Sequence, residues 1–178
     1  MSTVNSQLST ISHWWGFAAM PESMVYPSNG EDNPLTLVCQ FHLGTGMVYV
    51  LADLDYFFGD IDAESGHLGE WEPSFYKVLY SPTRENLHEH EIHYEDGTSA
   101  VPEPKPIDEG ESLVLSKPTT WTDELAQDYP GYKVLVQLEE DDDIGLRFYD
   151  CGTLFFLIKP EDLKARNFDN VKCVLYSY

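Results

Sequence analysis

Short apolar segments separated by turn-forming residues constrain the fold of this chain more than any other feature. Most segments are about four to eight residues long, a length typical of strands, and Val, Tyr and Phe are frequent in them. Gly, Pro, Asn and Asp separate them, and no long stretch repeats apolar residues with the helical period. The predicted strands are residues 34–43, 47–53, 55–60, 75–80, 91–95, 132–139, 146–150, 153–158 and 171–178.

Helical signals are few and short. One lies near residues 122–127, and another, near residues 160–166, begins with a proline followed by two acidic residues and ends with basic ones. Residues 100–111 contain closely spaced prolines, which favour an extended surface connection over a helix or a central strand. The sequence therefore predicts an α+β fold, mostly antiparallel β-sheet with few short helices, in a single domain spanning residues 1–178.

The charge of the chain excludes whole classes of partner. Asp and Glu number 31 and Lys and Arg only 10, so the formal net charge is −21. Binding to nucleic acid or to an anionic membrane depends on basic side chains, so we expect neither partner. A hydrophobic content of 42% and an aromatic content of 13% favour a packed core over a disordered chain.

The cysteines and the N-terminal residues indicate a reducing compartment. Cys39 and Cys173 lie in apolar runs, and no CxxC spacing occurs. The first residues form neither the basic region nor the apolar region of a secretory signal. We therefore expect a cytoplasmic protein. Cys151 follows Asp150, whose negative charge would raise the thiol pKa and argues against a catalytic nucleophile.

A weak internal similarity suggests that one β unit occurs twice. The matched positions are Gln40 with Gln137, Asp53 with Asp150, and, after one inserted residue, Phe57-Phe58 with Phe155-Phe156. Two copies of a strand, an acidic turn and a second strand would explain the pattern. Chance similarity among β-rich segments is the competing explanation.

A histidine cluster in residues 87–95 is the strongest candidate for metal binding. In an extended strand His88 and His90 would share one face, whereas His93 would lie on the other. Two imidazoles and a distant carboxylate could hold a divalent cation. The alternative is a polar edge strand. Because no familiar third ligand follows at a known spacing, we expect no metal and no cofactor.

The densest run of charge is the acidic turn, residues 139–143. Its members are Glu139, Glu140, Asp141, Asp142 and Asp143. The EF-hand pattern is absent, so the run is interpreted either as a solvated hairpin turn or as a contact site for a basic partner protein. Nothing in the local sequence is expected to pair with these carboxylates, so neutralising them should leave folding intact.

Motifs for catalysis are missing. The chain has neither a G-x-S-x-G sequence nor a phosphate-binding glycine loop. Tryptophans could line a groove for a small ligand, although core positions are the more frequent role. These tryptophans are Trp14, Trp15, Trp71 and Trp121. No catalytic residue is assigned.

Two parts of the chain resemble a known family. The first contains residues 16–27 (GFAAMPESMVYP), 34–43 (PLTLVCQFHL) and 55–60 (DYFFGD). The second, residues 132–178, has a Gln-ended strand, an acidic turn, an Asp-x-Gly, an aromatic pair and a DL-x-x-R-x-F segment. The residues at these positions are Gln137, Asp141 to Asp143, Asp150, Gly152, Phe155-Phe156, Asp162-Leu163, Arg166 and Phe168. In this order the chain resembles the YwqG-like family, a bacterial family of unknown function.

The resemblance implies an α+β fold with an internal pseudo-duplication and no established enzymatic activity. It marks Gln40, Asp53, Gln137, Asp150 and Gly152 as structural or family positions. Members of the family are often found near gene clusters for secreted toxins, which implies an immunity-type protein for a basic toxin. We therefore expect a non-catalytic protein-binding module. The alternatives are a sensor that binds a small ligand and an enzyme of unrecognised class that uses the histidines or paired carboxylates.

Overall fold

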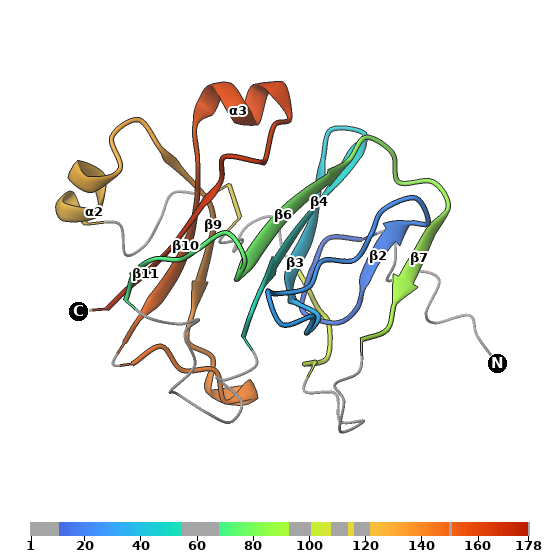
Figure 1. Cartoon of the computed structure of the whole chain (residues 1–178), viewed down its shortest axis with the longest axis horizontal. Helices are drawn as coiled ribbons and strands as arrows, with labels where there is room; N and C mark the ends of the chain where they lie inside the picture. The colour runs from blue at the N-terminus through green and yellow to red at the C-terminus, as the bar shows by residue number, and fades with distance from the viewer. Residues whose placement is uncertain are drawn as a thin grey trace. The chain divides into compact units, whose positions relative to one another are not determined.

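The computed structural model describes residues 11–54, 68–92, 101–107, 114–115, 122–149 and 151–177. These residues form mostly antiparallel strands with short helices (Figure 1), which confirms the predicted α+β fold. The chain divides into two compact units. The first unit comprises residues 1–55 and 74–108, and the second comprises residues 56–73 and 109–178.

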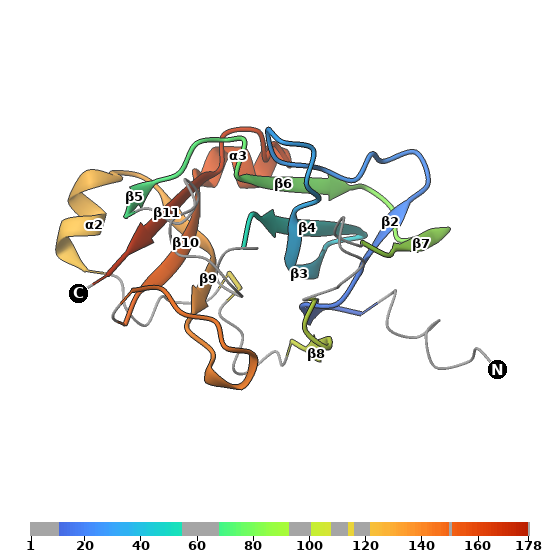
Figure 2. The ribbon, with the colours of Figure 1, turned by 60° about the horizontal axis from the view of Figure 1, so that its bottom comes forward.

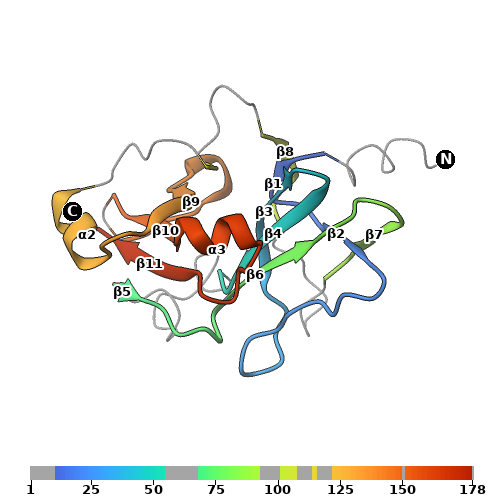
Figure 3. The same cartoon turned by 90° about the horizontal axis from the view of Figure 1, so that it is seen from above.

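The first unit is built on a five-stranded sheet with the order β6-β4-β3-β1-β8. A separate two-stranded sheet pairs β2 with β7, and Figure 3 shows these two strands side by side. The strands are β1 (His13–Trp14), β2 (Ala18–Pro21), β3 (Thr36–Leu43), β4 (Gly46–Ala52), β6 (Tyr76–Ser81), β7 (Leu87–His90) and β8 (Lys105–Pro106). Every pairing in both sheets is antiparallel.

The core of the first unit joins its two sheets. Apolar side chains of β2 pack with those of β3 and β4 in one buried cluster, which contains Ala18, Met20, Leu35, Leu37, Met47, Tyr49 and Leu51. The Tyr49 hydroxyl in this cluster donates a hydrogen bond of 2.7 Å to the carbonyl oxygen of Ala19. Burial raises the pKa of Tyr49, so this hydroxyl stays protonated and keeps donating.

The second unit contains a four-stranded sheet with the order β5-β11-β10-β9. Its strands are β5 (Gly69–Glu70), β9 (Lys133–Glu139), β10 (Thr153–Ile158) and β11 (Lys172–Tyr176). Helix α2 (Asp123–Asp128) precedes β9, and helix α3 (Pro160–Ala165) joins β10 to β11 (Figure 2). Both helices lie where the sequence predicted them.

The helix ends follow from local chemistry. The Thr122 hydroxyl accepts a hydrogen bond of 3.2 Å from the backbone N–H of Leu125 and so caps α2. Leu125 then packs with buried residues of the sheet, among them Phe155 and Val174. Pro160 occupies the first turn of α3, and Arg166 ends the helix in the left-handed conformation.

Most predicted strands are confirmed, and the two exceptions have local causes. Residues 146–149 form no strand, because Tyr149 has a φ of 63° that strands do not accommodate. β7 occupies residues 87–90 and ends before residues 91–92 of the predicted strand 91–95, because it pairs with the short strand β2, whose first residue Ala18 lies opposite His90. The predicted strand at 55–60 and residues 93–95 lie outside the described part of the chain.

Hairpins β3–β4 and β9–β10 share the same irregularity. Gln40 on β3 lies opposite Tyr49, and Gln137 on β9 lies opposite Phe155. In each hairpin the register shifts at one residue, which is Val38 in β3 and Leu135 in β9. Each of these bulged residues lies two positions before the glutamine.

The segments that lead into the two hairpins also correspond. The backbone N–H of Trp15 donates a hydrogen bond of 3.0 Å to the carbonyl oxygen of Val38. The N–H of Leu115 likewise donates one of 2.9 Å to the carbonyl oxygen of Leu135. Both donors have positive φ, 58° for Trp15 and 54° for Leu115. A shared bulge, a shared glutamine and a shared left-handed donor support the predicted pseudo-duplication.

The residue matches predicted beyond the glutamines are wrong. Phe155 corresponds to Tyr49 rather than to Phe57, because both lie opposite the glutamines. Asp53 follows β4, whereas Asp150 precedes β10. The cause is the connection between the strands, which is Gly44-Thr45 in the first hairpin and residues 140–152 in the second. An ungapped alignment cannot absorb this difference.

The side chain of Gln40 connects β3 to two other segments of the first unit. This side chain is fully buried. It accepts a hydrogen bond of 2.9 Å from the N–H of Ala19 and donates one of 3.2 Å to the carbonyl oxygen of Ile11. We predict that Gln40→Met lowers the free energy of unfolding by about 1–3 kcal/mol, because the buried N–H of Ala19 loses its acceptor and the carbonyl of the half-buried Ile11 loses a donor. Urea unfolding measures the loss. The exposed Gln127→Met serves as control and should change it by less than about 0.5 kcal/mol.

His13 gives the fold a pH dependence. Its ring is buried, and its Nδ1 lies 2.7 Å from the carbonyl oxygen of Trp15. Burial lowers the pKa of His13, although its backbone hydrogen bonds partly oppose the shift. The unfolded chain therefore takes up this proton at a higher pH than the folded chain does. Stability is complete above the ordinary histidine pKa of about 6.5 and falls as the pH drops toward the lowered value.

We predict that His13→Gln flattens the decrease in unfolding free energy between pH 7 and pH 5. A single proton contributes at most about 1.4 kcal/mol per pH unit to the slope. Urea unfolding at several pH values measures it. The exposed Gln127→Met, which removes no ionisable group, serves as the control and should leave the slope unchanged. Equal slopes for the wild type and His13→Gln would contradict this role of His13.

Candidate functional site

The acidic turn begins at the end of β9 and is a folded structure. Asp141 and Leu146 exchange two backbone hydrogen bonds of 2.9 and 3.2 Å, which close the turn. Between them lies the 3₁₀ turn η2 (Asp142–Ile144), and Gly145 follows it with a φ of 73°. The turn therefore has a fixed backbone, and its carboxylates do not share one environment.

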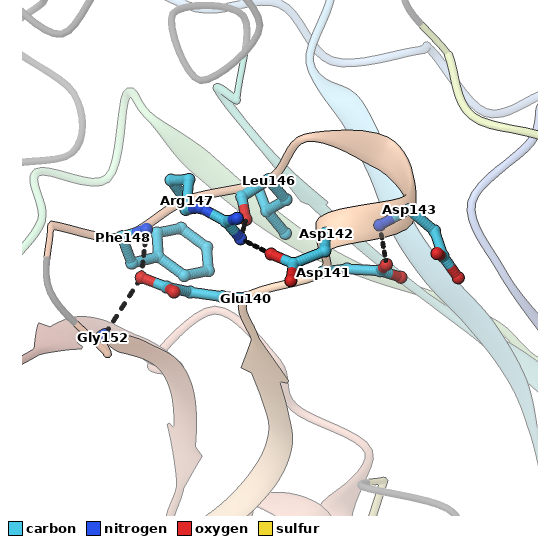
Figure 4. Close-up of polar contacts among 8 residues, drawn as sticks. All are labelled: Glu140, Asp141, Asp142, Asp143, Leu146, Arg147, Phe148 and Gly152. Carbon is cyan, nitrogen blue, oxygen red and sulfur yellow. Dashed lines mark hydrogen bonds and ion pairs between the residues drawn. The ribbon is translucent and has the colours of Figure 1, made fainter.

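Three of the carboxylates are engaged close to the backbone of the turn. Glu139 accepts a hydrogen bond of 2.7 Å from the side-chain amide of Gln137, and Asp141 accepts one of 3.0 Å from the backbone N–H of Asp143. Asp142 forms an ion pair with Arg147, and both side chains are exposed. The expectation that nothing local pairs with these acids is wrong, because the folded turn brings Arg147 back toward Asp142 (Figure 4). An exposed pair of this kind stabilises the fold little.

Glu140 organises the rest of the connection. One oxygen of its half-buried carboxylate accepts from two backbone N–H groups, that of Phe148 at 2.9 Å and that of Gly152 at 3.3 Å (Figure 4). These donors lie at the two ends of residues 148–152, so one side chain holds both ends. Sequence reasoning placed Glu140 among equivalent surface acids, and no local signal distinguishes it from its neighbours.

Gly152 is required by close packing. A Cβ atom at this position would lie 2.2 Å from the carbonyl oxygen of Phe148 and 2.6 Å from its Cβ. The N–H of Gly152 also donates 3.0 Å to that carbonyl. The chain at residue 152 thus passes so close to residue 148 that no side chain fits, which gives the glycine of the Asp-x-Gly pattern a steric reason. Asp150 lies outside the described residues.

Tyr149 and Cys151 hold unusual backbone conformations beside this contact. Their φ angles are 63° and 57°, and both residues are exposed. The neighbouring Leu146 and Phe148 are fully buried. Left-handed residues other than glycine carry a conformational cost and gather at functional sites. Sequence reasoning missed Tyr149, because a tyrosine between Phe148 and an acid is typical of a strand.

The equivalent hairpin in the first unit shows which part of this connection the fold requires. There, Gly44-Thr45 alone join the two strands, and Gly44 supplies the positive φ of 62°. The second hairpin has the same bulge and the same glutamine position, yet it is closed by residues 140–152. The longer connection is therefore an addition to a hairpin that a two-residue turn can close.

The other predicted positions lie elsewhere. Gln40 is part of the core of the first unit, and the Asp53 carboxylate accepts 2.9 Å from the amide of Asn29. His88 is exposed and His90 is half-buried on β7, and the His90 ring lies 5.8 Å from that of Tyr26. Within the described ranges no group of three or more His, Cys, Asp or Glu could hold a metal ion. His93 lies outside those ranges, so the absence of a metal stays a prediction.

Two cysteines and two tryptophans belong to the cores. Cys39 and Cys173 are buried, as predicted, and burial raises the pKa of each thiol. Cys151 is exposed. Trp15 and Trp71 are buried, which supports the core interpretation for both. In the described residues no helix has the length and apolar character needed to span a membrane.

Glu140 and Asp143 provide a matched test of the unequal roles of the acids. We predict that Glu140→Ala lowers the free energy of unfolding by about 1–3 kcal/mol, because the N–H of Phe148 loses its acceptor. Asp143→Asn should change it by less than about 0.5 kcal/mol, since this residue is exposed. Urea unfolding compares the two, and hydrogen exchange at Phe148 should accelerate only in Glu140→Ala. Equal effects of the two substitutions would contradict the assignment.

Comparison with known proteins gives a family. No curated protein matches the chain. Residues 70–176 match the family model described as a domain of unknown function, DUF1963. The match covers more than half of the 178 residues and includes the acidic turn, Glu140 and Gly152. The chain therefore belongs to the DUF1963 family.

Proposed function

We propose that this protein is a non-catalytic protein-binding module that recognises a basic partner protein through the acidic turn. The observation that carries the proposal is the connection 140–152, which the hairpin does not need and which holds exposed carboxylates on a fixed backbone. Loops placed on a rigid scaffold in this way are frequent binding elements. Asp142 and Asp143 are the exposed members, and Asp142 also pairs with the exposed Arg147.

The charge of the whole chain supports the same partner. A net charge of −21 attracts a basic protein over a distance set by the ionic strength and accelerates its association. The backbone that carries the acids of the turn is already held by hydrogen bonds, so it loses little further conformational freedom on binding. The net charge and the ordered backbone of the turn therefore favour the same kind of partner, a protein with a cluster of Lys and Arg.

The finer identity of the module is part of the proposal. The C-terminal pattern, from Gln137 to Phe168, lies inside the matched range and supports a YwqG-like protein of bacterial origin. We propose a cytoplasmic immunity-type role, in which a basic toxin is the partner, since an acidic surface suits such a target.

The test compares two variants with the same change in charge. Asp142→Asn/Asp143→Asn removes the exposed acids of the turn, and Glu22→Gln/Glu85→Gln removes two exposed acids of the first unit. Each full-length variant is immobilised on beads and incubated with a lysate of the source cells. The captured proteins are then quantified by mass spectrometry. A captured basic protein is then purified for surface plasmon resonance at two salt concentrations.

We expect the turn variant to capture less of one basic protein and to associate with it about three- to tenfold more slowly, with a shallower salt dependence. The control variant should behave like the wild type. Both variants should keep the melting temperature, because the exchanged residues are exposed. Equal capture by the two variants would place the contact outside the acidic turn.

A further inference from the structure

Tyr149 is the large apolar side chain that the connection 140–152 exposes. Its exposed fraction is 63%, whereas the adjacent Phe148 is fully buried. Single exposed aromatic residues are ordinary on protein surfaces, so exposure alone carries no argument. The backbone of Tyr149 and its surroundings provide one.

Folding does not account for a tyrosine at this position. A φ of 63° disfavours every residue with a Cβ, and aromatic residues have no local hydrogen bond that compensates, as Asn and Asp do. An exposed ring also recovers little free energy through burial. Glycine would meet the backbone requirement without this cost, as Gly44 does in the equivalent hairpin.

The surroundings of Tyr149 keep it in place. Glu140 accepts from the N–H of Phe148 immediately before it and from that of Gly152 after it. The Phe148 side chain is buried, and Gly152 approaches the Phe148 carbonyl so closely that the backbone has little room to move. The tyrosine is thus an exposed aromatic side chain on an ordered backbone, the arrangement that reduces the entropic cost of binding.

Resting on the function proposed above, we propose that Tyr149 is the anchor residue of the interface and that Glu140 is its positioning residue. The partner then has an apolar recess bordered by Lys or Arg. The recess takes the ring, and the basic groups meet Asp142 and Asp143 while lying against the aromatic face. Tyrosine is among the residues that most often dominate binding energy at interfaces.

The two parts of the interface make separable contributions. Carboxylates near the rim act mainly on the association rate through long-range attraction. A buried aromatic anchor acts mainly on the dissociation rate, because its contacts form only in the docked complex. Substitution of Tyr149 and neutralisation of the acids therefore give different kinetic signatures with the same partner.

The test uses photo-crosslinking in the full chain. Benzoylphenylalanine replaces Tyr149 in one protein, Asp143 in a second and Val25 in a third, where Val25 is the control because it is 86% exposed in the first unit. Each protein is irradiated in a lysate of the source cells, and adducts are identified by mass spectrometry. The adduct partner is then purified and its kinetics are measured with Tyr149→Ala, Tyr149→Gly and Glu140→Ala.

We expect a basic protein crosslinked from positions 149 and 143 but not from position 25. Tyr149→Ala should raise Kd at least tenfold, mainly through faster dissociation. Tyr149→Gly should lose the same affinity while melting at a temperature equal to or above that of the wild type, since glycine relieves the backbone. Glu140→Ala should weaken binding even at a temperature where circular dichroism shows it fully folded.

The contrary results separate this inference from the proposed function. An adduct from position 143 without one from position 149 overturns the anchor and leaves the acidic turn as the contact. Identical adducts from positions 149 and 25, or none from 149, also overturn the anchor. An acidic partner whose 149 adduct survives Asp142→Asn/Asp143→Asn supports the anchor and overturns recognition by charge. A lower melting temperature of Tyr149→Gly would show that the ring serves folding.

Discussion

The backbone hydrogen bond from a left-handed residue into a bulged strand is the constraint on which both units depend. Trp15 and Leu115 each donate to the carbonyl of the residue two positions before a glutamine, and this bond fixes where the neighbouring segment meets the strand. A bulge leaves one carbonyl outside the regular ladder, and a buried carbonyl without a partner is costly. The left-handed donor supplies that partner. Register and bulge are therefore determined together in each unit.

Because this constraint acts at one end of each hairpin, the opposite end is free to vary. The first unit uses Gly44-Thr45 there, and the second inserts residues 140–152 without changing the strand pairing. A longer loop raises the entropic cost of closing the hairpin only slightly, but it contains more backbone polar groups that need hydrogen-bond partners. Glu140 resolves part of that problem by accepting from two N–H groups. An acidic side chain thus replaces the strand partner that the connection lacks.

The sequence predicted what depends on neighbouring residues and missed what depends on distant ones. Helix α3 follows from Pro160 and the charges after it, and β10 follows from an unbroken apolar run. Residues 146–149 have the composition of a strand, but Leu146 bonds to the backbone of Asp141 and the N–H of Phe148 donates to the carboxylate of Glu140. The glutamines were matched correctly, but the positions after them were not. The two hairpins have connections of different length, and the sequences of the strands do not reveal this difference.

The candidate site shows why charge composition alone does not locate a binding surface. Five consecutive carboxylates have the same chemistry, yet the folded turn divides them. Glu139, Glu140 and Asp141 accept hydrogen bonds from groups of the same unit, and Asp142 and Asp143 remain exposed. The first group determines where the second group is held. A carboxylate that accepts backbone N–H groups is satisfied and offers a partner little, whereas the exposed Asp143 remains available to a cation and the exposed Asp142 shares its charge with Arg147. The internal bonds therefore select which charges of the turn are available for recognition.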